Sequence, residues 1–168
     1  DHLLVRTIEC LDGRVEVELV CEPVFDYGRT PAEWTLTDGG RNAADATGAG
    51  ATLRLRSDLA LGVEGGRVRA RHVLENGDRA FCSLSWAEEL AGSADVDDAA
   101  ARIDATIRFW RGWLGRARIP DHGFRDPIQR SMLTIKGLTY MPTGATVAAL
   151  TTSLPETPGG ERNWDYRY

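Results

Sequence analysis

The residues with the clearest capacity for chemistry lie in the run ERNWDYRY, over positions 161–168. Three of the last five residues are aromatic, and they alternate with one acid and one base. Aromatic rings pack on the apolar faces of pyranose sugars, while carboxylate and guanidinium groups bind the hydroxyls. The run therefore indicates a sugar-binding site, whose candidate residues are Trp164, Asp165, Tyr166, Arg167 and Tyr168. The alternative is the start of an amphipathic helix that packs these rings into a core.

The other reactive side chains do not form a recognisable motif. No phosphate-binding loop, dinucleotide fingerprint, nucleophile elbow or zinc motif occurs in the sequence. Cys10, Cys21 and Cys82 are odd in number and widely spaced, which predicts reduced thiols and not a disulfide framework. The three histidines are equally scattered. We therefore predict no metal site, and no cofactor is evident.

The charge distribution excludes some classes of partner. The net charge is −5, with acids and bases interspersed, which argues against nucleic acid as a partner. No apolar run is long enough to span a membrane. The run RVRARH places Arg67, Arg69 and Arg71 on one face of a strand. A solvated strand face is favoured there over a phosphate site.

Residues 1–92 have the period of two that is typical of strands, as in RVEVELV at 14–20. Asp12-Gly13 and Asn76-Gly77 lie between such runs, and each predicts a hairpin turn. Several short strands with tight turns and no intervening helix predict an antiparallel β-sandwich domain over 1–92.

From residue 93 the apolar period becomes 3.6. Asp95 is a candidate N-cap and Gly115 a candidate C-terminal stop for a linker helix within 93–120. A second helix is predicted to start at Asp126-Pro127. Two helices and an extended segment cannot close a core alone. Residues 121–168 are therefore expected to open a larger α-helical domain.

A family resemblance is carried by RSMLTIKGLTYMPTGATVAALTTSLPETPGGERNWDYRY, residues 130–168. This run closely resembles the opening of the catalytic domain in glycoside hydrolase family 15, the bacterial glucoamylase-like enzymes and their trehalase relatives. The runs EPVFDYGR at 22–29, SWAEE at 85–89 and TIRFWRGW at 106–113 resemble the β-domain and linker helix of the same family. The likeness covers essentially the whole chain.

The resemblance implies an N-terminal β-sandwich, a linker helix and the first elements of an (α/α)6 barrel, whose first helix spans about 124–140. It implies inverting hydrolysis of an α-glucosidic bond, with carboxyl groups about 6.5–9.5 Å apart. Both glutamates of that family lie downstream, so no catalytic residue is expected in this segment. Tyr166 matches the tyrosine that lines the subsite for the non-reducing glucose, and Trp164, Asp165, Arg167 and Tyr168 match the approach to it.

The sequence departs from the family pattern at both ends. A DGSIDW-like strand is not found before Asp1, and an Arg-Asp pair that grips glucose is not found after Tyr168. We therefore expect a piece of a longer enzyme, inactive alone, whose partners are the remainder of that enzyme and a sugar. The resemblance leaves open self-association and a requirement for phosphate or Mg²⁺.

The runs PETPGGE and TYMPTG resemble the trehalase branch of the family more than the starch-acting branch, which favours α,α-trehalose as the substrate. Glucoamylase-like hydrolysis of α-glucans is the alternative. A non-catalytic structural β-domain is the alternative from another class. A carbohydrate-binding module would use Trp34 and Trp86, for which burial in the sheet is favoured. The reduced cysteines predict a cytoplasmic protein, and the resemblance to the bacterial enzymes implies a bacterial one.

Overall fold

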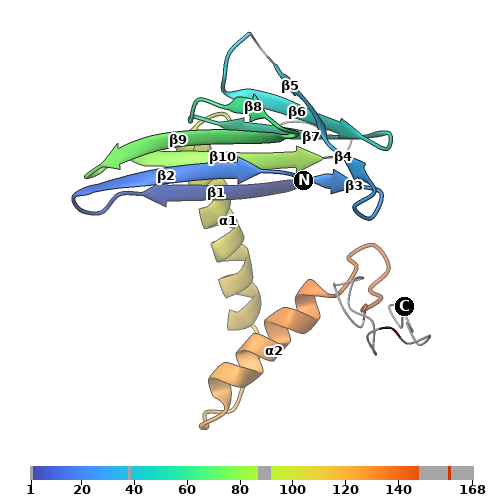
Figure 1. The fold of residues 1–168 in the computed structure, drawn as a ribbon. Helices are drawn as coiled ribbons and strands as arrows, with labels where there is room; N and C mark the ends of the chain where they lie inside the picture. The colour runs from blue at the N-terminus through green and yellow to red at the C-terminus, as the bar shows by residue number, and fades with distance from the viewer. Residues whose placement is uncertain (1, 38, 87–91, 148–158, 160–168) are drawn as a thin grey trace. The chain divides into compact units, whose positions relative to one another are not determined.

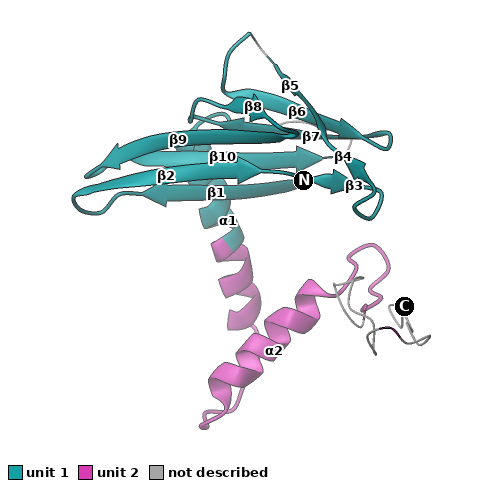
Figure 2. Cartoon of the chain, viewed as in Figure 1, with its two compact units in different colours: residues 1–106 teal, residues 107–168 magenta. Residues whose placement is uncertain are grey.

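The computed structural model of the chain describes residues 2–37, 39–86, 92–147 and 159. The chain divides into two compact units, Asp1–Thr106 and Ile107–Tyr168, which Figure 2 shows in separate colours. No helix within the described part is long and apolar enough to cross a membrane.

Unit 1 consists mostly of antiparallel strands in two main sheets (Figure 1). The five-stranded sheet has the order β1 (Leu3–Glu9), β10 (Arg79–Trp86), β7 (Ala51–Ser57), β6 (Ala43–Gly48) and β5 (Glu33–Leu36). The three-stranded sheet has the order β2 (Arg14–Cys21), β9 (Arg67–Glu75) and β8 (Gly62–Glu64). A short pair joins β3 (Val24–Phe25) to β4 (Thr30–Pro31). The predicted antiparallel β-rich domain is confirmed.

The two main sheets share one hydrophobic core. Leu55 on β7 and Ala80 on β10 belong to the same buried cluster as Val68 and Leu74 on β9. Val17 and Leu19 on β2 pack against this cluster with partly buried side chains. Because residues of both sheets contribute to one cluster, the sheets form the two layers expected of an antiparallel sandwich.

The two predicted hairpins are wrong in their pairing, although each turn reverses the chain. Gly13 and Gly77 have positive φ values of 69° and 85°. However, β1 pairs with β10, and β2 pairs with β9, so each turn carries the chain from one sheet to the other. The two crossings are joined by backbone hydrogen bonds, from Gly77 N–H to the Cys10 carbonyl (2.8 Å) and from Cys10 N–H to the Asp78 carbonyl (3.0 Å).

The outer face of β10 is buried beneath the segment that leads into the first helix. Ser83 and Ser85 are almost fully buried there, and the Ser83 hydroxyl accepts a hydrogen bond from the Ser93 backbone N–H (3.0 Å). Gly92 lies so close that an added Cβ would meet the Ser83 hydroxyl at 2.8 Å. Small side chains on both elements therefore permit this close approach.

Helix α1 (Val96–Gly115) begins where the sequence predicts. The Asp95 carboxylate accepts hydrogen bonds from the backbone N–H groups of Asp97 (3.0 Å) and Asp98 (2.8 Å), as an N-cap does. Gly115 is the last helical residue, so the helix also ends where the sequence predicts, although Gly115 is not among the described glycines with positive φ.

Helix α2 (Arg125–Gly137) lies in unit 2 and begins one residue before Asp126. The N-cap residue is Phe124, which makes no side-chain cap hydrogen bond. Asp126 therefore lies inside the first turn, where its charge still favours the helix dipole. The predicted helix start at Asp126-Pro127 is therefore one residue too late, because the actual N-cap residue has no capping side chain that the sequence could reveal.

We expect Asp95→Ala to lower the free energy of unfolding by about 1 kcal/mol, because two backbone N–H groups lose their acceptor. Urea denaturation monitored by circular dichroism measures this change. Asp104→Ala is the matched control, since Asp104 is an exposed acid in the interior of α1. An equal loss of stability in both variants would contradict the capping role.

Asp98 makes stability depend on acid pH. The hydrogen bond from the Arg102 guanidinium (2.9 Å) lowers the pKa of the Asp98 carboxyl, and burial opposes this shift. A pKa lowered by folding gives stability that is present above the unfolded value and is lost as pH falls through the folded one. We expect Asp98→Asn to weaken the fall in melting temperature below pH 4, the range set by the ordinary pKa of 3.8. Asp104→Asn should leave that fall unchanged.

Candidate functional site

The predicted sugar-binding residues lie outside the described part of the chain. These are Trp164, Asp165, Tyr166, Arg167 and Tyr168. The last continuous described stretch before them contains α2 and the turn that follows it, and ends at Val147. The site residues therefore stay a prediction.

The turn after α2 is held by a compact set of hydrogen bonds. Thr139 and Thr146 form an antiparallel bridge, and their hydroxyl oxygens lie 3.3 Å apart. The Tyr140 backbone N–H donates to the Ala145 carbonyl (2.7 Å), and the Gly144 N–H donates to the Tyr140 carbonyl (2.8 Å). Gly144 has a φ of 76°, which residues other than glycine rarely adopt. This bridge fixes the direction in which the chain leaves α2.

Unit 2 presents an apolar surface that no described residue covers. Helix α2 has no buried residue among those described: Ile135 is 58% exposed, whereas Ile128 and Met132 are half-buried. Phe124, Tyr140 and Met141 are also exposed. A helix with no fully buried apolar residue gains stability from partner helices, so this surface is the kind found where further helices pack.

The arginine row on β9 is neutralised and is not a phosphate site. Arg67 lies 3.5 Å from Glu22, and Arg71 lies 3.2 Å from Glu18. Arg69 contacts both Glu18 and Glu64 at 3.5 Å. The preferred interpretation, a solvated strand face, is confirmed. Exposed pairs of this kind add little stability.

A small pocket of about 320 Å³ on unit 1 contains two carboxylates, Asp58 and Asp95. The Asp58 carboxylate accepts a hydrogen bond from the Phe81 backbone N–H (3.0 Å), and Asp95 caps α1. Glycoside hydrolysis by inversion needs one acid and one base that are free to transfer protons. Because both groups already bind backbone, this pocket is structural. The described residues contain no cluster of histidine, cysteine and carboxylate groups suited to a metal ion.

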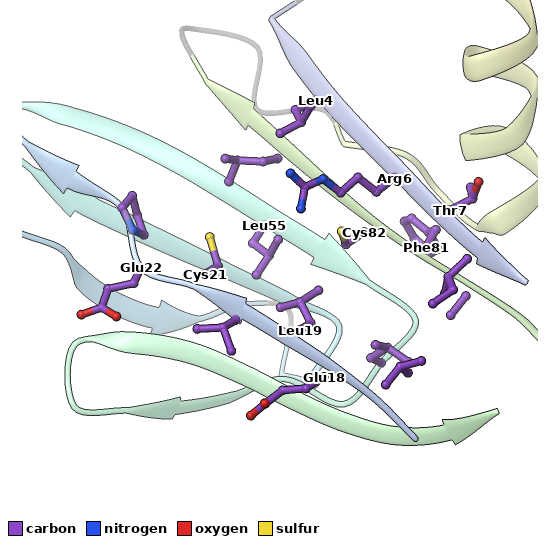
Figure 3. A pocket seen from close by; sticks show the side chains of 17 residues that line it. Leu4, Arg6, Thr7, Glu18, Leu19, Cys21, Glu22, Leu55, Phe81 and Cys82 are labelled. Carbon is purple, nitrogen blue, oxygen red and sulfur yellow. The ribbon is translucent and has the colours of Figure 1, made fainter. Parts of the chain in front are cut away.

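A cleft of about 670 Å³ lies between β1 and β2 (Figure 3). We call it the β1–β2 cleft; its walls also include side chains of β10 and β7. The lining is mostly apolar, and its polar members are Arg6, Thr7, Glu18, Glu22 and the two thiols. The lining residues used below are Leu4, Arg6, Ile8, Leu19, Cys21, Leu55, Cys82 and Leu84.

Arg6 lines the cleft together with Cys21 from one sheet and Cys82 from the other (Figure 3). Burial raises the pKa of the Cys21 thiol, the Cys82 thiol adds to this, and the Arg6 guanidinium opposes it. Burial also raises the pKa of the Cys82 thiol, again opposed by Arg6. Both cysteines are free, as the sequence predicts, and both thiols are kept in the less reactive protonated form.

The tryptophans of unit 1 do not form a sugar-binding surface on the sheet. Trp34 packs against the core, as predicted. Trp86 is 40% exposed and contacts the His2 ring at 5.8 Å between centroids, so the prediction of burial is wrong for it. The reason is its place at the last position of β10, where the sheet ends.

The cleft was not predicted from the sequence, although a signal for it is present. In LLVRTI the residues Leu4, Arg6 and Ile8 alternate, which places a charged residue on the apolar face of a strand. A charge in that position marks a face that needs either a partner acid or water.

Comparison with known proteins finds relatives that are all named as trehalases. The chain is 47% identical over 173 residues to a protein named Trehalase from Mycolicibacterium smegmatis and to another from Mycobacterium tuberculosis. These matches cover 100% of this chain but only 26% and 25% of the relatives. It is also 51% identical over 175 residues to Trehalase 2 of Sulfolobus acidocaldarius, covering 98% of this chain and 29% of that protein. The predicted resemblance to part of a trehalase is confirmed.

The chain spans about a quarter of the length of the curated relatives it matches. No family profile matches the chain. No solved structure matches it either.

We expect Arg6→Met to raise the pKa of both Cys21 and Cys82, because the guanidinium that favours the thiolates is removed. The pH dependence of iodoacetamide alkylation, followed at each cysteine by peptide mass spectrometry, measures the midpoints. Arg14→Met is the matched control on β2 and should not move them. Midpoints that stay in place in Arg6→Met would contradict the assigned electrostatic role.

Proposed function

We propose that this chain is the N-terminal portion of an inverting glycoside hydrolase that converts α,α-trehalose and water into two glucose molecules. The observation that carries the proposal is 47% identity, over the whole chain, to proteins named Trehalase in two mycobacteria. Relatives with that name favour trehalose over the α-glucans of the glucoamylase alternative. They also favour an enzyme over a purely structural β-domain.

In this proposal the chain has three parts. Residues 1–92 form the β-sandwich domain, residues 93–120 contain the linker helix, and residues 121–168 begin the (α/α)6 barrel of the resemblance to glycoside hydrolase family 15. The lack of any fully buried residue in the described α2 supports the third part, since a barrel helix must pack against neighbours. The bridge between Thr139 and Thr146 would then direct the chain from the first barrel helix toward the sugar site.

The site residues contribute to binding in this proposal. Tyr166 lines the subsite for the non-reducing glucose. Trp164 and Tyr168 supply rings for the apolar faces of the sugar, and Asp165 and Arg167 bind hydroxyl groups.

The acid and base are supplied by the rest of the enzyme in this proposal. A carboxylic acid there protonates the leaving oxygen, and a carboxylate about 6.5–9.5 Å away activates water. The 168 residues alone are therefore expected to be inactive. We place the enzyme in the cytoplasm.

The test is hydrolysis of trehalose and of maltose by the full-length protein that contains this chain, assayed with and without Mg²⁺ and phosphate. We expect faster release of glucose from trehalose. A higher rate on maltose would overturn the trehalase assignment, and activity on neither sugar would overturn the proposal as a whole.

We expect Arg167→Lys in the full-length enzyme to lower kcat/KM for trehalose by roughly 10- to 150-fold, because lysine cannot make the paired hydrogen bonds of a guanidinium. Arg116→Lys is the matched control, since Arg116 is an exposed arginine just after α1. Equal kcat/KM values for Arg167→Lys and the parent enzyme would remove Arg167 from the sugar site.

A further inference from the structure

The run EPVFDYGR contains a strained turn that the proposed function leaves unexplained. The turn joins β3 to β4 (Figure 1), and we call its residues 26–29 the β3–β4 loop. Asp26, Tyr27 and Gly28 have positive φ values of 49°, 54° and 85°. Glycine adopts this left-handed region freely and aspartate tolerates it, whereas a bulky tyrosine there is an outlier. Tyr27 is therefore held in its conformation at a steric cost.

Burial does not offset the strain at Tyr27. The residue is 91% exposed, so its ring removes little apolar surface from water. Tight turns with left-handed central residues normally carry asparagine, aspartate or glycine there, and each of these lowers the strain. Strained residues of this kind gather at sites that bind ligands. The exposed ring therefore makes the loop a candidate binding element.

The loop is anchored to the sheet, so it presents the ring on a fixed support. The Gly28 N–H donates to the Phe25 carbonyl (3.1 Å), and the Arg29 N–H donates to the Asp26 carbonyl (3.0 Å). The half-buried Phe25 ring lies against β6, where a Cβ added to Gly48 would overlap it. A preorganised surface loses less conformational entropy on binding than a mobile one, which favours the binding of a small ligand.

The loop also carries one acid and one base. The Arg29 guanidinium lies 3.9 Å from the Asp26 carboxylate, with side chains 77% and 45% exposed. An exposed pair at this distance contributes little stability, so both groups can exchange each other for a ligand. An aromatic ring packs on the apolar face of a pyranose, while a carboxylate and a guanidinium bind its hydroxyls. The three side chains together therefore have the chemistry of a sugar contact.

We propose that the β3–β4 loop binds a glucose unit of an α-glucoside, in addition to the predicted sugar site at 161–168. Tyr27 packs on the apolar face of the pyranose, and Arg29 and Asp26 bind its hydroxyl groups. The choice of glucose rests on the proposed function, whose substrate and product both contain it. A protein partner fits less well, because a stable protein interface takes about 20–30 residues from each side.

The test uses the full-length protein that contains this chain, with Tyr27 replaced by fluorotyrosine and glucose as the probe. We expect a saturable change in the fluorine chemical shift during titration with glucose, because the ring comes to lie against the sugar. Sorbitol has the hydroxyl groups of a hexose but no ring, and it should cause no such change. Leu11, which is 81% exposed in the turn after β1, is the matched control position for the label and should show no change.

Three results of this titration would overturn the proposal. The first is no change at Tyr27 with glucose, and the second is an equal change with sorbitol. The third is a change that follows protein concentration without sugar, which would identify a protein contact.

We expect Arg29→Met in the labelled protein to weaken the apparent affinity for glucose by about tenfold, because hydrogen bonds from a charged group are lost. Arg41→Met is the matched control, since Arg41 is an exposed arginine before β6, and it should leave the affinity unchanged. An affinity in Arg29→Met equal to that of the parent protein would overturn the role assigned to Arg29.

The strain argument has its own test in the melting temperature. Ala49 is an exposed residue in the turn after β6 with a φ of 50°, so Ala49→Gly is the matched control for Tyr27→Gly. We expect each variant to raise the melting temperature by about 1–3 °C, because glycine adopts positive φ without the steric cost. A melting temperature lowered only in Tyr27→Gly would show that the ring stabilises the fold, and would overturn its assignment to a ligand.

Trehalose hydrolysis by the same preparation separates the two conclusions. Hydrolysis without the glucose-dependent change at Tyr27 would overturn the sugar contact of the β3–β4 loop and leave the proposed function standing. The glucose-dependent change without hydrolysis would overturn the proposed function and leave the sugar contact standing.

Discussion

The organisation of unit 1 depends on the hydrogen-bonded contact between its two sheet crossings. The Cys10 carbonyl and N–H bind Gly77 and Asp78, so the turns after β1 and β9 are held together at one end of the sandwich. This contact places β1 beside β10 in one layer and β2 beside β9 in the other. The core between the layers then determines which side chains face inward. The cleft follows from the same arrangement, because β1 and β2 are both left at sheet edges.

The sequence predicts the elements of this fold better than their partners. Alternation in RVEVELV and a carboxylate at Asp95 are local signals, and the strand and the helix start appear where they indicate. Asp12-Gly13 and Asn76-Gly77 suit any tight turn with positive φ, so they cannot distinguish a hairpin from a crossing between sheets. That choice is made by burial across the two layers, which involves residues far apart in the sequence. The start of α2 was misplaced for a different reason, since Phe124 offers no capping side chain to detect.

The candidate sites show the same division between local and distant information. The aromatic and charged run at 161–168 is recognisable from its residue types alone, and the resemblance that it carries agrees with relatives named Trehalase. Arg6 has a recognisable signal too, as a charge on an apolar strand face, but its meaning depends on which described strands lie opposite it. Only the arrangement of the two sheets shows that the exposed Arg6 side chain lines a cleft between them.

Both units present apolar surface that their own described residues leave uncovered, and this has one physical explanation. In unit 1 the surface is the inner face of β1, and in unit 2 it is the stripe of α2 that includes Ile135. Leaving such side chains in water forgoes about 25 cal/mol for each square ångström that burial would remove from it. A free-standing domain avoids that loss by closing its core, as the buried cluster around Leu55 and Val68 does. Uncovered apolar surface in each unit agrees with the proposal that the chain is part of a longer protein.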